Sequence, residues 1–438
     1  MPKHAVKADP SIADIIALNP AGQGVAQLQD RQVAVHGALP GEEISFRSYG
    51  GRRGNRRAEL VEVLRASPHR IAPRCPHFGV CGGCKLQHLD HNGQLAFKQA
   101  QLMDMLLQAG GVAPAEILEP LVGPLWHYRR KARLSVRWVE KKGRVLVGFR
   151  ELNGRYVADL DECHILDERI AGRLPELASL IAGLSIYNSI PQLEVACGDQ
   201  LAALVFRVLT PPSEDDEKKL RAFAQASGIA VFLQPAGPDS ISALAPNEVQ
   251  LDYYIHEYGL RLEFGPANFI QVNAGLNQLM ISRVLGLLAV SNGDTVLDLF
   301  CGLGNFTLPL ARLAGTVYGV EGDAGLVSLA RHNAGLNGLS NTHFEVADLA
   351  VEGVALPQSE NGFNKILLDP PRSGAAAVLP AVAASDAEKL VYVSCNPATL
   401  ALDAAQLVGQ YGFRFESAGI MDMFPHTSHI ETCATFTR

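Results

Sequence analysis

The sequence predicts a multidomain protein with a small N-terminal β-barrel, a central α+β domain and a C-terminal α/β domain built on a parallel sheet. Three observations support this prediction. Short alternating apolar runs between turn residues fill 11–68, which is typical of a small β-barrel. Three cysteines then stand within ten residues, beginning at Cys75. From about Asn273 onward, strand-like and helix-like runs alternate, which predicts parallel strands joined by helices.

The composition is that of an ordinary globular protein, with 47% hydrophobic residues in a chain of 438. No apolar run approaches the roughly 20 residues needed to span a bilayer, and 1–20 lacks the apolar segment of a signal peptide. We therefore expect a cytoplasmic protein without a membrane partner, and we expect a monomer. In a reducing compartment, eight cysteines favour metal binding or catalysis over disulfides.

The charge of the chain is unevenly distributed. The net charge of −7 argues against a nucleic-acid partner, but 47–74 hold eight basic and two acidic residues, and 127–150 hold nine basic residues and one acidic residue. Two local basic patches on an acidic chain indicate a polyanion bound at one face. We expect phosphate contacts from the arginine-rich loop 52–57 and from the stretch 129–133.

The barrel is predicted from alternating runs at 24–28, 32–35, 43–46 and 58–64, which are separated by turns that contain Pro or Gly. A helical pattern follows over 91–110, and mixed strand and turn signals fill 125–264 without showing their topology. We assign 11–68 to the barrel, 69–92 and 125–264 to the central domain, and 93–124 and 265–438 to the C-terminal domain.

A metal centre is predicted from Cys75, Cys81 and Cys84, because Pro and Gly residues among them let the backbone wrap around a centre. Thiolates select zinc or an iron–sulfur cluster. Cys163 is the best candidate for the fourth ligand, since Cys197 lies inside a strand-like run. The spacing does not match the paired Cys-x-x-Cys of most zinc ribbons, so it favours iron–sulfur and leaves zinc open.

A nucleotide-like cofactor is predicted at the start of the α/β domain. The strand 295–300 ends in a glycine turn with Gly302 and Gly304, where a ligand is able to approach the backbone. The pattern lacks the third glycine of a dinucleotide fingerprint. Glu321 ends the next strand and is placed to bind ribose hydroxyls, and Asp348 follows a third strand near an adenine amino group. This combination fits S-adenosylmethionine.

Two further strand ends define the chemistry. Asp369-Pro-Pro-Arg372 holds a carboxylate toward the cofactor or a target base, and it also occurs in enzymes that methylate amino groups. Cys395, in the Ser-Cys-Asn-Pro turn after a buried strand, separates the two chemistries, because amino methylation needs no thiol. Carbon-5 of uracil becomes nucleophilic once a thiolate adds to carbon-6. We therefore predict Cys395 as the nucleophile.

The second half of that reaction needs a base that removes the carbon-5 proton. Glu431 lies in the last strand-like run, where a charged residue is unusual unless it has a role. Burial and the neighbouring histidines are able to tune its pKa. We predict Glu431 as the base, with His429 as the second choice.

Several motifs together resemble the RNA (uracil-C5)-methyltransferases. They are Asp-Leu-Phe-Cys-Gly-Leu-Gly-Asn-Phe at 298–306, Asn-Phe-Ile-Gln-Val-Asn at 268–273, Asp-Pro-Pro-Arg at 369–372, Ser-Cys-Asn-Pro at 394–397 and His-Ile-Glu at 429–431. The barrel looks like the RNA-binding TRAM domain of that family, and Cys75, Cys81, Cys84 and Cys163 look like its [4Fe–4S] site. Barrel and cluster cysteines together resemble the branch that acts on 23S ribosomal RNA.

The resemblance implies a Rossmann-like, S-adenosylmethionine-dependent methyltransferase domain, with Cys395 as nucleophile and Glu431 as base. It implies S-adenosylmethionine contacts from Gln271, Phe300, Asn305, Glu321, Asp348 and Asp369. The main hypothesis is methyl transfer to carbon-5 of a uridine in 23S ribosomal RNA. The alternatives are a tRNA uracil-C5 methyltransferase, an RNA-binding or ribosome-assembly protein without activity, and an amino-methyltransferase that uses the Asp369 loop.

Overall fold

The computed structural model describes residues 10–28, 31–49, 57–152, 154–360 and 362–438. The chain divides into two compact units. Unit 1 comprises Met1–Gln101, Arg150–Tyr156 and Phe424–His429, and unit 2 comprises Leu102–Phe149, Val157–Met423 and Ile430–Arg438. Within the described ranges, no helix is both long and apolar enough to cross a bilayer.

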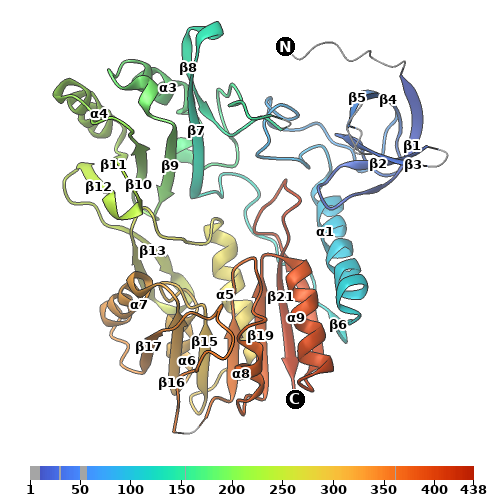
Figure 1. The fold of residues 1–438 in the computed structure, drawn as a ribbon, viewed down its shortest axis with the longest axis vertical. Coiled ribbons are helices and arrows are strands. Elements are labelled where there is room, and N and C mark those ends of the chain that lie inside the picture. Colours follow the sequence, from blue (N-terminus) through green and yellow to red (C-terminus); the bar gives the residue numbers. More distant parts are fainter. Residues whose placement is uncertain (1–9, 29–30, 50–56, 153, 361) are drawn as a thin grey trace. The chain divides into compact units, whose positions relative to one another are not determined.

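The N-terminal barrel of unit 1 confirms the small β-barrel that the sequence predicts. Its strands are β1 (Ser11–Leu18), β2 (Gly24–Leu28), β3 (Arg31–His36), β4 (Glu43–Tyr49) and β5 (Arg57–Arg65), closed in the order β1-β2-β3-β5-β4 (Figure 1). Alternate side chains point inward, and Val35, Ile44 and Phe46 are fully buried there. The sequence does not predict β1, because a register shift between Ile15 and Ala17 interrupts its period of two.

The rest of unit 1 is held by polar contacts around one helix. Helix α1 (His91–Met105) runs into a π-helical turn, η2 (Leu106–Gly110), which confirms the helix predicted over 91–110. Lys98 Nζ donates a 3.0 Å hydrogen bond to the Phe424 carbonyl, and Gln94 Oε1 accepts one of 2.8 Å from the His426 amide. The segment Phe424–His429 therefore belongs to unit 1, although it connects the last two strands of the chain.

The central sheet of unit 2 supplies the topology that the sequence does not predict. Its strands run in the order β12-β11-β10-β9-β7-β8. They are β7 (Lys131–Val139), β8 (Arg144–Gly148), β9 (Gln192–Cys197), β10 (Ala202–Arg207), β11 (Ala230–Gln234) and β12 (Ser242–Ala245). The helices are α2 (Glu168–Ala171), α3 (Leu174–Ala182) and α4 (Glu214–Ser227). Most neighbours are antiparallel, but β10 and β11 are parallel because α4 connects them.

Short elements link this sheet to the C-terminal one. The hairpin β13 (Leu251–Ile255) and β14 (Leu260–Phe264) buries Tyr253 and Phe264. The 3-10 turns are η3 (Glu140–Lys142), η4 (Tyr187–Ser189), η5 (Pro238–Ser240) and η6 (His256–Tyr258). Helix α7 (Ala324–Leu336) packs on β14, so the hairpin is joined to the C-terminal domain.

The C-terminal sheet confirms the predicted α/β domain and has the order β17-β16-β15-β18-β19-β21-β20-β6 (Figure 1). Its strands are β6 (Glu116–Ile117), β15 (Thr295–Leu299), β16 (Thr316–Glu321), β17 (Thr342–Val346), β18 (Lys365–Leu368), β19 (Lys389–Ser394), β20 (Arg414–Met421) and β21 (Glu431–Thr437). The helices are α5 (Ala274–Leu288), α6 (Thr307–Leu313), α7 (Ala324–Leu336), α8 (Leu379–Ala383) and α9 (Pro397–Gly409).

The direction of the strands determines where their ends meet. Strands β17, β16, β15, β18 and β19 are neighbours in the sheet and run parallel. The residues after β15, β16, β18 and β19 therefore gather at one edge of the sheet. Strand β21 is antiparallel to β19, which brings the start of β21 to the same edge. The buried strands are almost continuously apolar, as expected for strands covered on both faces.

Candidate active site

The predicted nucleophile lies in the turn between β19 and α9. Cys395 directly follows β19, and Asn396 caps α9 by accepting a 3.2 Å hydrogen bond from the Ala398 amide. The Ser394 hydroxyl accepts a bond of 3.1 Å from the Asn396 amide, which tightens the turn. The Cys395 side chain is partly exposed, unlike the fully buried Cys433 in the neighbouring strand. A substrate is therefore able to reach this thiol.

The predicted base lies opposite the nucleophile in the sheet. In the antiparallel pair β19–β21, Ser394 stands across from Thr432, so continuation of this register places Cys395 across from Glu431. Glu431 is only 5% exposed. Burial is the largest cause that raises the pKa of its carboxyl to about 8; the Asp369 carboxylate also raises this pKa, and Arg372 lowers it. The structure thus brings together two residues that local sequence patterns indicate separately.

The Asp369 loop completes this group. Asp369 follows β18, and its amide donates a 3.3 Å hydrogen bond to the carbonyl of Leu299. Burial raises the pKa of the Asp369 carboxyl to about 7. Burial also raises the pKa of the Cys395 thiol, and the Glu431 carboxylate adds to this, whereas a hydrogen bond and the charge of Arg372 lower it. Arg372, for which the sequence predicts no role, is therefore the cation of the site.

The glycine turn lies beside Asp369 at the end of β15. Phe300, Gly302 and Gly304 all have positive φ, at 67°, 56° and 98°. The Glu321 carboxylate accepts hydrogen bonds from the amide of Gly302 at 3.1 Å and from the amide of Gly322 at 2.8 Å. Glu321 therefore fixes the turn, and its remaining lone pairs are available to a diol.

Asp298, at the end of β15, is a buried acid without a predicted role. One carboxylate oxygen accepts a 2.5 Å hydrogen bond from Thr307, and the other has no partner among the described residues. Burial, with smaller contributions from the Asp369 and Glu321 carboxylates and against the hydrogen bond from Thr307, raises the pKa of Asp298 to about 8. Three acids in one region attract a cation, and S-adenosylmethionine carries both a sulfonium and an ammonium group. The sequence signal for a cofactor role of Asp298 is its position as the first residue of the glycine motif.

Two of the predicted cofactor residues are held by other side chains. Asn305 Oδ1 accepts hydrogen bonds from Tyr253 and Asn277, both 2.9 Å, and Asn305 Nδ2 donates to Asn277 at 3.0 Å. The backbone carbonyl of Gln271 accepts a 2.9 Å bond from Arg130 Nε. These contacts hold the side chain of Asn305 and the backbone of Gln271. A contact from Asn305 to a ligand would use its remaining amide hydrogen or its backbone.

The other predicted cofactor residues stand at the ends of neighbouring strands. Phe300 directly follows β15 and is partly exposed, and Asp348 lies two residues after β17 and is exposed. Asp348 Oδ1 accepts a 3.0 Å bond from the Ala350 amide. The Ala347 amide donates to the Glu321 carbonyl at 3.1 Å, which keeps the loop after β17 beside β16. The parallel sheet therefore places both positions at the edge where the ends of its strands gather.

A second cysteine and the alternative base differ from the chosen residues. Cys301 is 6% exposed, and burial with the Asp298 and Glu321 carboxylates holds the pKa of its thiol well above the ordinary value, which disfavours a thiolate. The ring of His429 packs on Phe424 with centroids 5.4 Å apart within unit 1. Cys301 is therefore a poorer candidate for the nucleophile than Cys395, and His429 is a poorer candidate for the base than Glu431.

The predicted metal ligands are divided between the two units. Cys75, Cys81 and Cys84 belong to unit 1 and Cys163 to unit 2. In the described part of the chain, no group of three or more His, Cys, Asp or Glu side chains stands ready to hold a metal ion. One local feature fits a cluster: the Gly83 amide donates to Cys81 Sγ at 3.4 Å, and such N–H···S bonds stabilise cluster thiolates.

The structure describes the second basic stretch fully, but it leaves out most of the first. Arg52, Arg53 and Arg56 lie outside the described residues. In the second stretch, Arg130 is 4% exposed and lies 4.6 Å from the centre of the Tyr253 ring, whereas the Arg133 side chain is 71% exposed. Arg130 therefore has a structural role, and Arg133 is the more accessible to a phosphate.

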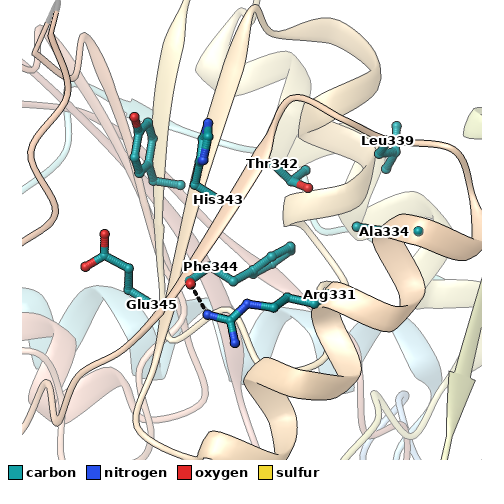
Figure 2. Close-up of a pocket in the computed structure, with 9 residues that line it drawn as sticks. Arg331, Ala334, Leu339, Thr342, His343, Phe344 and Glu345 are labelled. Atoms are coloured by element: carbon teal, nitrogen blue, oxygen red, sulfur yellow. Dashed lines mark hydrogen bonds between the residues drawn. The ribbon is translucent and has the colours of Figure 1, made fainter.

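Two hollows on unit 2 lie away from the paired Cys395 and Glu431. Figure 2 shows the first, a cavity of about 510 Å³ along β17 and α7, where Arg331 donates to the Phe344 carbonyl. The second, of about 500 Å³, is lined by residues that include Arg130, Arg169 and Asn273. No predicted catalytic or cofactor residue lines either one.

Comparison with known proteins gives consistent matches. A family model described as tRNA (Uracil-5-)-methyltransferase matches residues 90–438. The 23S rRNA (uracil(1939)-C(5))-methyltransferase RlmD of Alkalilimnicola ehrlichii is 52% identical over 426 residues, which cover 97% of this chain and 96% of that protein. The RlmD of Xanthomonas campestris pv. campestris (strain 8004) is 50% identical over 427 residues, with the same coverage.

A solved structure is similar over nearly the whole chain. The Pyrococcus abyssi tRNA (uracil-54, C5)-methyltransferase, in complex with S-adenosyl-L-homocysteine, matches with a TM-score of 0.75 and covers 98% of this chain and 100% of its own. The two sequences are 22% identical, so this likeness concerns the fold. It agrees with an N-terminal barrel followed by an α/β methyltransferase domain.

Proposed function

Because this chain belongs to the tRNA (uracil-5-)-methyltransferase family, we propose that it methylates carbon-5 of a uridine in 23S ribosomal RNA in the cytoplasm. Membership makes it an S-adenosylmethionine-dependent methyltransferase, as the resemblance of its motifs predicts. The choice of 23S ribosomal RNA over tRNA rests on relatives of at least 50% identity that carry that description, among them the two described above. The observation that supports the chemistry is the antiparallel β19–β21 register, whose last pair, Ser394 and Thr432, directly adjoins Cys395 on one strand and Glu431 on the other.

The proposed reaction assigns one role to each residue. The Cys395 thiolate forms a bond to carbon-6 of the target uracil, and the displaced electron pair makes carbon-5 nucleophilic. S-adenosylmethionine supplies the electrophilic methyl group that carbon-5 takes up. The Glu431 carboxylate then removes the carbon-5 proton, the ring recovers its double bond and Cys395 leaves as a thiolate. Arg372 favours the thiolate form of Cys395 at the first and last steps.

The cofactor side of the site uses the acids at the strand ends. Glu321 would bind the ribose hydroxyls, and Phe300 and Asp348 would lie against the adenine. Asp298 and Asp369 would face the cationic methionine end, where burial has raised the pKa of both carboxyls. Gln271 and Asn305 complete the proposed set. The Asp369 carboxylate raises the pKa of both Asp298 and Glu431, which supports a role for it close to the cofactor residues and to the catalytic pair.

The metal centre is a separate part of the proposal. Cys75, Cys81, Cys84 and Cys163 would hold a [4Fe–4S] cluster, for which four thiolates are the ordinary ligand set. Their spacing and the Gly83 amide that donates to Cys81 Sγ support this choice. The cluster would supply folding free energy to the cysteine loop, and no step of the methylation needs it.

RNA binding is proposed for the barrel and for exposed basic residues of β7. The loop 52–57 and Arg133 would contact phosphates, which position the substrate without reading its sequence. The target uracil must leave its stack before it meets Cys395, because carbon-6 is otherwise covered by neighbouring bases. Phe269 is 69% exposed in the loop that precedes Gln271, and it offers a surface on which a base is able to stack.

The test is methylation of isolated 23S ribosomal RNA by the purified protein, followed by mass mapping of the modified nucleotides. We expect one 5-methyluridine with the wild-type chain and none with Cys395→Ala. A methylated amino group, or full activity of Cys395→Ala, would instead establish an amino-methyltransferase. Modification of tRNA in preference to ribosomal RNA would overturn the substrate assignment and leave the chemistry intact.

A further inference from the structure

One buried carboxylate, Asp403, does not belong to the proposed catalytic set. It connects the segment that carries Cys395 to the segment that carries Arg372. Asp403 lies on α9 and is 2% exposed. One of its oxygens, Oδ2, accepts a 2.6 Å hydrogen bond from the Tyr392 hydroxyl and a 2.8 Å bond from the Ala375 amide. Tyr392 lies in β19, three residues before Cys395, and Ala375 lies three residues after Arg372. A single buried oxygen thus joins the nucleophile strand to the arginine loop.

The same loop is bound to α9 at a second point. The Arg372 carbonyl accepts hydrogen bonds from Asn396 Nδ2 at 2.9 Å and from the Thr399 hydroxyl at 3.4 Å. Gly374, between the two anchors, has φ +85°, and a Cβ added there would stand 2.8 Å from Asp403 Oδ2. Only glycine accommodates this backbone at so close an approach. Hydrogen bonds to α9 and its cap residue therefore anchor the loop on both sides of the three residues from Arg372 to Gly374.

We propose that Asp403 is a positioning residue that holds the Arg372 loop against the turn of Cys395, and we call Asp403, Tyr392 and Ala375 the Asp403 clasp. The proposal rests on the proposed function in taking Cys395 as the nucleophile. Asp369, at the other end of the loop, is anchored separately by its bond to Leu299. Loss of the clasp should therefore loosen the loop on the Arg372 side, where only the bonds of the Arg372 carbonyl remain, and leave Asp369 in place.

The expected effect follows from the groups around the thiol. Glu431 and Asp369 raise the pKa of Cys395, and Arg372 is the cation that lowers it. The hydrogen bond from Arg372 and its positive charge both favour the thiolate of Cys395 over the thiol. Displacement of Arg372 should therefore slow alkylation of Cys395 about tenfold near neutral pH and move its pH profile to higher pH.

The test measures alkylation of the Cys395 peptide by mass spectrometry as a function of pH. We expect Asp403→Ala to shift the profile as Arg372→Ala does, and we expect Asp403→Asn to retain the wild-type profile, because its amide oxygen still accepts both bonds. Leu402→Ala, on the exposed side of the same helix, is the matched control. Affinity for S-adenosylmethionine should stay near wild type in Asp403→Ala.

Three outcomes would overturn the clasp: an unshifted profile in Asp403→Ala, a shift in Asp403→Asn equal to that in Asp403→Ala, or an equal shift in Leu402→Ala. If Asp403→Ala does not fold, Gly374→Ala tests the same approach of loop and helix, and an unchanged profile there would also overturn it. The thiol titration needs neither RNA nor cofactor, so it is independent of the proposed reaction. Failure of the wild-type chain to form a covalent adduct with 5-fluorouridine RNA would count against the proposed function instead.

Discussion

At the scale of residues, the proposed nucleophile and base share an environment that disfavours negative charge. Burial raises the pKa of both Cys395 and Glu431, and Glu431 is the next cause of the shift at Cys395. A raised pKa lowers the thiolate fraction but makes the thiolate a stronger nucleophile. Because both groups act in their deprotonated forms, the methylation rate should rise with pH through about 8, the pKa of Glu431.

The two catalytic steps should separate when Glu431 becomes Gln. Thiolate addition and methyl transfer precede removal of the carbon-5 proton, so Glu431→Gln should accumulate a methylated covalent protein–RNA adduct. Denaturing gels with labelled RNA would detect the adduct, and mass spectrometry would locate it on Cys395. Wild type with 5-fluorouridine RNA should give the same trapped species, because its carbon-5 has no removable proton. Normal turnover by Glu431→Gln would exclude it as the base and make His429 the next residue to test.

Cofactor binding should release protons because of the buried acids. Asp298 and Asp369, with pKa values of about 8 and about 7, are partly protonated between these values in the free protein. A cationic ligand favours their charged forms, so binding should release protons and affinity should rise with pH across this range. Calorimetry in buffers of different ionisation enthalpy measures the release. Asp298→Asn should reduce it, and an unchanged value would place the ammonium group elsewhere.

At the scale of elements, the strands around the site are predictable from the sequence. The apolar run of β19 and the glycine turn after β15 carry local signals, and the structure has both where the sequence places them. The pairing of Cys395 with Glu431 has no local signal, because it depends on the antiparallel register of β21. Asp403 looks like an ordinary polar residue of a helix, and only the packing of α9 on its neighbours shows that it is buried.

Internal contacts also decide which basic residues are available for RNA. Along β7, Arg133 and Arg137 are exposed, and Leu134 and Val136 between them are buried, as the period of a strand requires. Arg130 lies before the strand and is bound to the Gln271 carbonyl. A count of basic residues therefore overestimates the number of phosphates that this stretch is able to bind.

Salt dependence tests the proposed RNA contacts. Replacement of Arg52, Arg53, Arg56 and Arg57 with Ala should weaken RNA binding and reduce the slope of log affinity against log salt, by roughly 0.7 for each phosphate that the loop no longer neutralises. Affinity for S-adenosylmethionine should not change. Replacement of the exposed Lys218 and Arg221 of α4 is the control for general charge. An unaltered slope in the four-fold variant would show that the loop does not bind RNA.

At the scale of the whole molecule, the chain returns to earlier parts of its fold at several points. Residues Phe424–His429 belong to unit 1, while β20 before them and β21 after them belong to the C-terminal sheet of unit 2. Strand β6, far earlier in the chain, pairs with β20 in that sheet. These crossings are the reason why domain boundaries are hard to infer from composition, which changes gradually along the sequence.

The cysteine set gives the whole-molecule prediction, because a cluster held by Cys75, Cys81, Cys84 and Cys163 would close a long loop of the chain. Anaerobically purified protein should be brown and contain iron and acid-labile sulfide, and Cys163→Ser should lose both and melt at a lower temperature. Cys197→Ser is the matched control, since Cys197 is also buried in unit 2 and burial raises the pKa of its thiol to about 12, which disfavours the thiolate that a cluster requires. Stoichiometric zinc without sulfide would show that the cysteines bind zinc and not an iron–sulfur cluster. If the cluster is lost in Cys197→Ser and retained in Cys163→Ser, the fourth ligand is Cys197 and not Cys163.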